Sequence, residues 1–256
     1  LKTELMGLSV MGEIPLVIVD VQRLGPATGG ATTVGQGDVQ FVRWGTSGGY
    51  PIIALAPTDA VDSYRLTVRA FELAERFRCP VFVVTDKDVA MTPVTVDPDD
   101  LIGWPIADRA WATEGTPYRY APAGSVHPVH EYGRGATVRF TGSTHDEAGY
   151  ITKDSATIGA LNTHLVAKIE AHLDEIELIE ADLEPGATSL VVAYGVTAGA
   201  ARVAVRQARS SGSRVSLAII RSLWPVPTTA VEKAMIGTER VVVPELNPGL
   251  YARELE

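Results

Sequence analysis

The feature that most constrains the fold is a short apolar run at residues 16–19 (LVIV), which ends at an acid and leads into a glycine-rich loop. An apolar run without polar alternation is typical of a parallel strand covered on both faces, and we expect such a strand here. In open α/β sheets, ligands bind outside the carboxyl ends of the strands. The residues after Asp20 therefore occupy the place of a binding site, although a plain strand-to-loop turn explains this stretch equally well.

Two residues of this loop suit an anionic ligand. Arg23 has a planar guanidinium whose fork of donors matches a carboxylate. Thr28 adds a hydroxyl, and the glycines beside it allow backbone N–H groups to approach a ligand. Arg23 and Thr28 are therefore the candidate binding residues of the chain.

The first half of the chain continues with alternating strands and helices. Residues 52–56 and 81–84 are predicted strands, and residues 1–11 and 39–44 are predicted short helices. A longer helix begins after Pro57-Thr58-Asp59, with Thr58 as its predicted cap. Its buried stripe is predicted to be Val61, Tyr64, Val68, Phe71 and Ala74, and its solvent face Arg65, Arg69, Glu72 and Arg76. This order of elements predicts a parallel α/β sheet.

A proline-rich stretch at residues 91–157 has no long period and is too long for an ordinary connection, so we expect an arm. His127 and His130 lie within it, but their spacing lacks a third ligand and is weak evidence for a metal site. A long helix is predicted at 158–179, with Lys168 among the residues of its polar side.

The last third reads as a second α/β unit. Strands are predicted at 189–193, 215–220 and 241–243, and helices after Gly195 and at 228–235. We therefore divide the chain into residues 1–92, an arm with a long helix at 93–185, and residues 186–256.

Three features of the second unit are candidate sites. The turn at residues 195–199 (GVTAG) lacks the G-x-G-x-x-G spacing, and Arg221 follows the next strand, so a plain turn is favoured over a nucleotide site. Glu245 and Asn247 follow a strand, where they form a site, cap the next helix or meet a partner subunit. Neither a G-x-x-x-x-G-K-[ST] loop nor a G-x-S-x-G elbow is present.

Composition narrows the class of protein. A formal net charge of −9 and the absence of a basic run argue against nucleic acid as a partner. Cys79 is the single cysteine, expected to be buried, and one cysteine cannot hold an iron–sulfur cluster. The sequence has neither a signal-peptide pattern nor an apolar run long enough to span a bilayer, which favours the cytoplasm. It begins without Met inside a predicted helix and ends in another, so we expect it to be incomplete at both ends.

Several segments together resemble a known family. Residues 19–29 (VDVQRLGPATG) are similar to the V-x-V-Q-R-x-G-P-S-T-G segment of the α subunit of 2-oxoacid:ferredoxin oxidoreductases, especially the 2-oxoglutarate type. The supporting segments, in consistent order over nearly the whole chain, are residues 36–38 (QGD), 70–75 (AFELAE), 80–81 (PV), 85–87 (TDK), 141–150 (TGSTHDEAGY) and 243–247 (VPELN).

The resemblance implies a thiamine-diphosphate pyrimidine-binding domain followed by a transketolase C-terminal-like domain. It implies oxidative decarboxylation of a 2-oxoacid to an acyl-CoA, with ferredoxin as electron acceptor. By motif match, Arg23 binds the substrate carboxylate and Thr28 lines the same pocket. Thiamine diphosphate with Mg²⁺ and a [4Fe–4S] cluster would belong to a site shared with, or held by, a β subunit. The resemblance assigns this chain no catalytic residue, no cofactor-binding residue and no metal ligand.

The sequence departs from the family pattern in two places. The Y-P-I-T-P segment and the cofactor-activating glutamate are not among these residues, and Glu4 is not assigned that role. The family's T-K-T-E-Q is here residues 32–36 (TTVGQ), without the lysine and the glutamate, so a branched-chain 2-oxoacid stays open as substrate. A nucleotide-binding or redox-docking module and a non-catalytic scaffold also stay open as functions of the chain.

Overall fold

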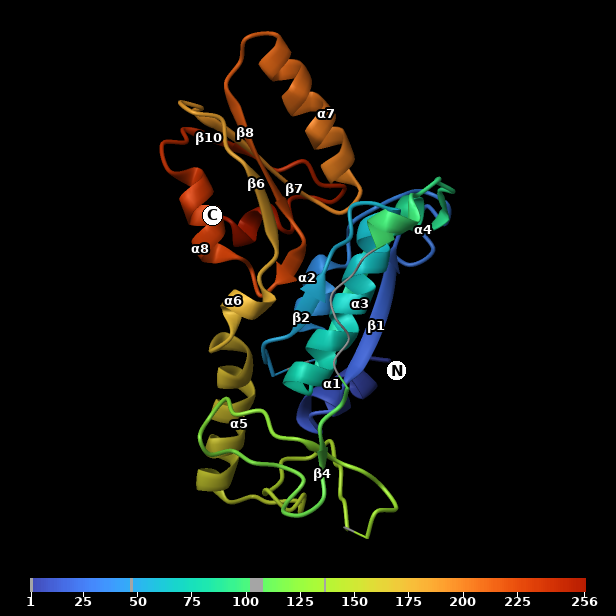
Figure 1. Cartoon of the computed structure of the whole chain (residues 1–256), viewed down its shortest axis with the longest axis vertical. Helices are drawn as coiled ribbons and strands as arrows, with labels where there is room; N and C mark the ends of the chain where they lie inside the picture. The colour runs from blue at the N-terminus through green and yellow to red at the C-terminus, as the bar shows by residue number, and fades with distance from the viewer. Residues whose placement is uncertain (1, 47, 102–107, 136) are drawn as a thin grey trace.

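The computed structural model describes residues 2–46, 48–101, 108–135 and 137–256. They form two α/β units, each built on a four-stranded sheet, and an arm that packs below the first unit (Figure 1). The predicted class, two units with mainly parallel sheets, is confirmed.

The first sheet has the strand order β1-β3-β2-β9. Its strands β1 (Leu16–Gln22), β2 (Ile53–Leu55) and β3 (Pro80–Asp86) are parallel, and the register pairs Leu16 with Pro80 and Gln22 with Asp86. The fourth strand, β9 (Ser222–Trp224), comes from near the other end of the chain and pairs antiparallel with β2. The predicted strands of the first half are confirmed, and β1 is longer than predicted.

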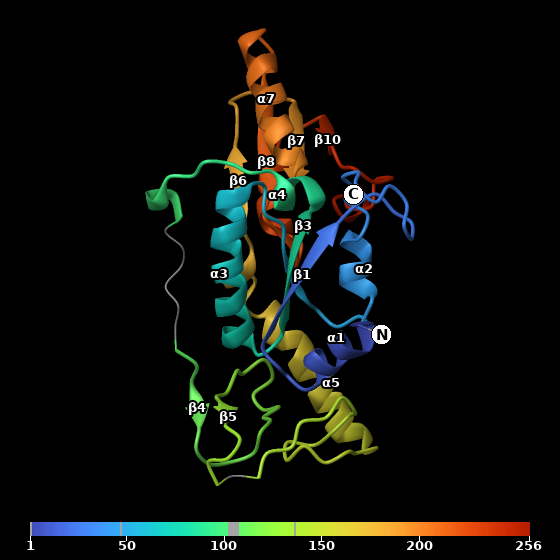
Figure 2. The same cartoon turned by 90° about the vertical axis from the view of Figure 1, so that its right-hand side faces the viewer.

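Strand β1 is an edge strand in the described part of the chain, with β3 on one side only. The expectation that it is covered on both faces is wrong, because Val19 and Val21 are exposed beside the helix α3 (Ala60–Phe77). Figure 2 shows α3 and α2 (Val39–Trp44) on opposite faces of the sheet, but β1 lies at its open side, where Val19 and Val21 are left exposed.

The phase of α3 differs from the prediction. The buried side chains are Leu66, Ala70, Leu73 and Phe77 together with Ala74, and they pack on β2 and β3. Tyr64 and Phe71, predicted to be buried, are exposed. The helix has apolar side chains on two faces at the same spacing, and only packing against the sheet decides between them. Its cap is Asp59 and not Thr58, since the Asp59 carboxylate accepts from the Asp62 N–H at 2.8 Å.

The short helix α4 (Lys87–Met91) ends the first unit. The arm up to residue 154 contains only short elements in its described part: the 3₁₀ turn η1 (Pro98–Leu101), β4 (Trp111–Ala112) and β5 (Val129–His130). The long helix predicted at 158–179 is shorter, because α5 (Ser155–Glu170) ends near His172, where the backbone leaves the helical region. A single turn, α6 (Leu173–Ile176), follows. Strand β6 (Ile179–Asp182) then joins the second sheet, antiparallel to β8.

The second sheet has the order β10-β7-β8-β6, with β7 (Ser189–Tyr194), β8 (Val215–Ile220) and β10 (Arg240–Val242) parallel. Helices α7 (Thr197–Ser210) and α8 (Thr228–Met235) are as predicted, and a 3₁₀ turn, η2 (Ala252–Glu254), comes last. One core cluster joins both units, since it contains Phe82 of β3, Val192 of β7 and Trp224 of β9. The units therefore share buried surface. Helix α1 (Lys2–Met11) precedes β1, as predicted, and no described helix is long and apolar enough to cross a membrane.

Candidate functional site

The loop after β1 is closed on itself and held by Arg23. The N–H of Leu24 donates to the carbonyl of Thr33 at 2.9 Å, which brings the two ends of the loop together. The guanidinium of Arg23 donates from Nη2 to the carbonyl of Ala27 at 3.1 Å and from Nη1 to the carbonyl of Thr28. Arg23 and Thr28 therefore lie in contact on one loop at the carboxyl end of β1, and the Thr28 side chain is exposed.

The returning half of this loop packs directly on its start. A Cβ at Gly35 would lie 2.8 Å from the nitrogen of Leu24 and 2.9 Å from the carbonyl carbon of Arg23. No side chain fits there unless the loop moves. The residue that stands in place of the family's glutamate is thus a glycine in backbone-to-backbone contact with Arg23.

Two acids lie near Arg23. Asp38 donates its backbone N–H to Oε1 of Gln22 at 2.9 Å. Burial, and then the neighbouring Asp38, raise the pKa of Asp20 to about 6. Burial also raises the pKa of Asp38, while the positive charge of Arg23 lowers it. The carboxyl end of β1 thus combines one guanidinium with two carboxyl groups, of which Asp20 changes charge near pH 6.

Gln36, at the end of this loop, connects the loop to the second unit. It is buried, with 1% of its surface exposed. Its side-chain Nε2 donates to the carbonyl of Tyr194 at 3.0 Å, and its Oε1 accepts from the N–H of Leu246 at 2.9 Å. Its backbone N–H donates to the carbonyl of Leu246 at 3.0 Å, and its carbonyl accepts from Nδ2 of Asn247 at 2.8 Å. The segments at 36–38 and 243–247, which resemble the family separately, are therefore in contact.

The candidate nucleotide turn at Gly195 is filled by this glutamine. A Cβ on Gly195 would lie 2.8 Å from Nε2 of Gln36, so the glycine is needed to accommodate the Gln36 side chain. Arg221 is bonded to Asp62 at 2.8 Å and to Glu180 at 2.9 Å. Both observations favour the plain strand-to-helix turn.

Glu245 and Asn247 order the chain that follows them. The Glu245 carboxylate accepts from the backbone N–H groups of Tyr251 and Ala252, each at 3.1 Å, and from the hydroxyl of Tyr194 at 2.8 Å. This is the capping role, one of the three expectations for Glu245.

The carboxyl ends of β3 and β7 also meet. The carboxylate of Asp86, which caps α4, faces the backbone N–H of Val196, and this N–H favours the charged form of the carboxyl group. Figures 1 and 2 both show α7 beginning beside α4. The ends of β1, β3 and β7 therefore border one surface, as the position of a site in an open sheet requires.

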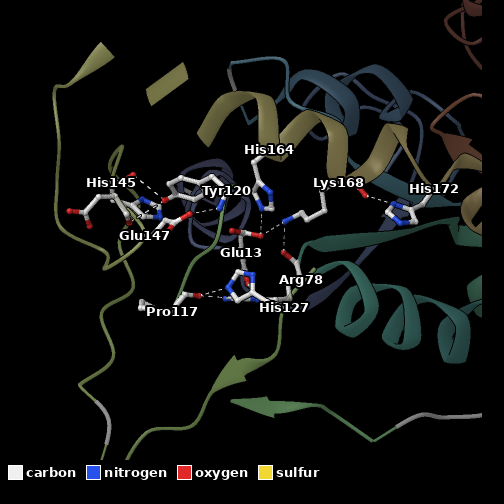
Figure 3. Close-up of polar contacts among 11 residues, drawn as sticks. Glu13, Arg78, Pro117, Tyr120, His127, His145, Glu147, His164, Lys168 and His172 are labelled. Atoms are coloured by element: carbon white, nitrogen blue, oxygen red, sulfur yellow. Dashed lines mark hydrogen bonds and ion pairs between the residues drawn. The ribbon is translucent and has the colours of Figure 1, made fainter. Parts of the chain in front are cut away.

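A second polar cluster is buried where the arm meets the first unit (Figure 3). Glu13, with 1% of its surface exposed, accepts from Nζ of Lys168 at 2.7 Å and contacts Nε2 of His164 at 3.1 Å. Although burial opposes ionisation, the charge of Lys168 and the contact with His164 lower the pKa of Glu13. Arg78, on the same cluster, donates to the carbonyl of Pro117 at 3.1 Å. The expected solvent position of Lys168 is therefore wrong, because Glu13 pairs with it inside the protein.

The histidines of the arm are bonded to backbone. Nε2 of His127 lies 2.9 Å from the carbonyl of Pro117, and Nε2 of His130 lies 3.1 Å from that of Thr116. Nδ1 of His145 lies 2.7 Å from the carbonyl of Ser143. In the described ranges, no group of three or more His, Cys, Asp or Glu side chains could hold a metal ion.

Cys79 and Glu4 lie away from the loop. Cys79 is buried, as expected, and burial raises the pKa of its thiol to about 12. Glu4 is exposed on α1 at the rim of a pocket of about 570 Å³, near the start of β1 and so at the opposite end of that strand from Arg23. Sequence reasoning identifies Arg23 and Thr28 but not Asp38 or Gln36 as neighbours of the loop. Their only signal is membership of a family-like segment.

Two family models match the chain. Residues 1–164 match the model described as pyruvate flavodoxin/ferredoxin oxidoreductase, thiamine diphosphate-binding. Residues 187–256 match pyruvate:ferredoxin oxidoreductase core domain II. The second match begins between β6 and β7 of the structure.

Known proteins are similar over the whole chain. The 2-oxoglutarate synthase subunit KorA of Methanocaldococcus jannaschii is 36% identical over all of this chain, which spans 69% of that relative. The 2-oxoglutarate oxidoreductase subunit KorA of Mycobacterium tuberculosis is 29% identical, and the chain spans 40% of it.

A solved structure is similar in fold. The 2-oxoglutarate:ferredoxin oxidoreductase from Magnetococcus marinus, with 2-oxoglutarate, coenzyme A and succinyl-CoA bound, superposes with a TM-score of 0.89 at 28% identity. The match covers 99% of this chain and 45% of the solved one.

Proposed function

Since the chain belongs to the 2-oxoacid:ferredoxin oxidoreductase family, we propose that it is the substrate-holding α subunit of an enzyme that oxidatively decarboxylates a 2-oxoacid. The products are an acyl-CoA and CO₂, and ferredoxin takes the electrons. The observation that carries the proposal is the position of Arg23 and Thr28 on one loop at the carboxyl end of β1.

Arg23 is suited to hold the carboxylate that is lost as CO₂. A guanidinium has five N–H donors, and the hydrogen bonds to Ala27 and Thr28 occupy two of them. The others remain for a bidentate contact with a carboxylate. The two carbonyl contacts fix the guanidinium before substrate arrives, so less entropy is lost on binding. Holding the carboxylate aligns the bond that breaks.

Thiamine diphosphate, when bound, supplies the stabilisation of the carbanion that decarboxylation requires. The residues around Arg23 fit the substrate end of such a site, since the guanidinium and the exposed Thr28 hydroxyl are donors for a 2-oxoacid. We propose that the diphosphate with Mg²⁺ and the [4Fe–4S] cluster are held by the β subunit, with coenzyme A as co-substrate. This chain then catalyses nothing by itself.

The substrate we favour is 2-oxoglutarate, on the strength of the named relatives. Thr33 and Gly35 replace the lysine and glutamate of the family pattern, and Gly35 has no room for a side chain. A branched-chain 2-oxoacid is therefore the alternative. The ratio of kcat/KM for 2-oxoglutarate and for 3-methyl-2-oxobutanoate decides between them.

The divisions at residues 1–92, 93–185 and 186–256 remain our proposal for the domains, the first a pyrimidine-binding type and the last a transketolase C-terminal type. We also propose a cytoplasmic location, where ferredoxin-linked oxidation of metabolites would take place.

The test is replacement of Arg23 in the full-length α subunit assembled with its β subunit. Arg23→Gln should lower kcat/KM for the 2-oxoacid by about 10²-fold or more, because a carboxylate-positioning group is lost. Arg206→Gln, on the exposed side of α7, is the matched control and should leave kcat/KM unchanged.

Two results would contradict the proposal. Unchanged turnover in Arg23→Gln would favour a non-catalytic scaffold. Tight binding of NAD(P) or a flavin to the assembled complex, unaffected by Arg23→Gln, would favour a redox-docking module.

A further inference from the structure

We propose that Gln36 is a positioning residue through which the second unit sets the geometry of the Arg23 loop. The inference rests on the proposed function of that loop. It assigns a task in substrate binding to a unit that contributes no side chain to Arg23 or Thr28.

Every polar atom of Gln36 is bonded to the second unit. The backbone N–H and Oε1 both bond to Leu246, Nε2 bonds to Tyr194, and the carbonyl bonds to Asn247, at 2.8–3.0 Å. The residue is almost fully buried. A buried glutamine with all four groups paired is held in one orientation, because losing any partner leaves an unpaired polar group away from water.

The residue that precedes Gln36 in the chain is in direct contact with the backbone of Arg23. Gly35 precedes Gln36 and lies against the carbonyl carbon of Arg23 and the nitrogen of Leu24, with no room even for a Cβ. Leu24 is in turn tied to Thr33 by the 2.9 Å hydrogen bond that closes the loop. A shift of Gln36 is therefore passed to the backbone that carries the guanidinium.

A backbone shift at this point changes substrate binding more than folding. The guanidinium is already bonded to Ala27 and Thr28 within the same loop, so its direction depends on the path of the loop. A displaced guanidinium loses the bidentate geometry with the carboxylate, which weakens binding of the 2-oxoacid. Loosening Gln36 should thus raise KM for the 2-oxoacid while KM for coenzyme A stays the same.

The experiment compares three variants of the full-length α subunit in complex with its β subunit. Gln36→Met keeps the shape but loses both side-chain hydrogen bonds. Asn247→Asp keeps the acceptor for Leu250 and loses the donor to the Gln36 carbonyl and to the Tyr194 hydroxyl. The control is Gln40→Met, since Gln40 also bonds to the second unit, through Leu250 at 2.8 Å, but lies in α2 and outside the loop.

We expect KM for the 2-oxoacid to rise by about tenfold or more in Gln36→Met and Asn247→Asp, with kcat changed less than KM. KM for coenzyme A should match that of Gln40→Met. A KM for the 2-oxoacid within about twofold of Gln40→Met would overturn the proposal, as would an equal rise of both KM values.

A second measurement does not depend on activity. The amides of Leu24, Gly30 and Thr33 close the loop, and their hydrogen exchange should quicken by about tenfold in Gln36→Met but not in Gln40→Met. Unchanged exchange would overturn the positioning role even if the complex oxidises no 2-oxoacid. If exchange quickens in a complex that has no activity, the proposed function is refuted, but the positioning of the loop by Gln36 is supported.

Discussion

Replacing Glu13 by glutamine should destabilise the chain by about 3–5 kcal/mol, because it leaves Lys168 charged and buried without its partner. The two groups are 2.7 Å apart, with 1% and 2% of their surfaces exposed. At an effective dielectric constant of about 20, their attraction is about 6 kcal/mol. The burial of two ions offsets most of that gain. The stability that is lost when the pair is broken is therefore much larger than the net stability that the intact pair contributes.

The double variant tests this reasoning. Glu13→Gln and Lys168→Met should each cost about 3–5 kcal/mol in urea unfolding, whereas the two together should cost less than either alone. Lys168→Met is the milder of the two, because His164 and Arg78 still face Glu13. Additive losses in the double variant would refute the account, since they would mean that the two residues stabilise the arm independently.

The pH dependence gives the same pair a second readout. The pKa of Glu13 is lowered in the folded chain from its ordinary value of 4.5. A carboxyl with a lowered pKa contributes stability that is present above its unfolded pKa and lost as the pH falls. Stability should therefore decline below about pH 4.5 in the wild type and less steeply in Glu13→Gln.

Two further predictions concern single residues. Asp20→Asn should stabilise the chain progressively as the pH rises from about 4 to about 6, because the pKa of Asp20 is raised from 3.8 to about 6 and its charged form is the disfavoured one in the fold. The gain above pH 6 should reach at most about 3 kcal/mol in urea unfolding, and a gain that does not change with pH would contradict this cause. Cys79 should react with iodoacetamide about 10²-fold more slowly in the native chain than in urea, because burial raises its thiol pKa to about 12; comparable rates would show that the strand after α3 opens readily.

Most of the fold follows from local patterns. Short apolar runs such as residues 81–84 and 215–220 favour buried strands, because their length and the flanking glycine and proline residues argue against helices. The boundaries of α8 match the prediction residue for residue, since Thr228 follows a proline and Gly237 follows the last apolar position.

The wrong predictions have a common physical cause. Which face of a helix is buried depends on segments that are distant in the sequence. Tyr64 and Phe71 repeat at the same spacing as Leu66 and Leu73, so periodicity cannot say which set meets the sheet. Lys168 looks like a surface residue until Glu13, far away in the sequence, is placed beside it.

The candidate site divides in the same way. Arg23 and Thr28 can be identified from sequence because they lie five residues apart in one motif, within reach of local reasoning. Gln36 cannot, because its partners are Tyr194, Leu246 and Asn247, more than 150 residues away. The sequence does not show whether a glutamine is buried or exposed, because that depends on its tertiary contacts.

The antiparallel strand β9 has a consequence for synthesis of the chain. Strands β1, β2 and β3 have left the ribosome once Asp86 is free, but the strand that covers the edge of β2 ends at Trp224. At about 5–20 residues per second, the nascent sheet waits on the order of ten seconds for it. A ribosome stalled before Trp224 would therefore present an open β2 edge, the kind of surface that nascent-chain chaperones protect. The first sheet to be translated is thus completed only after β6, β7 and β8 of the second sheet have been made.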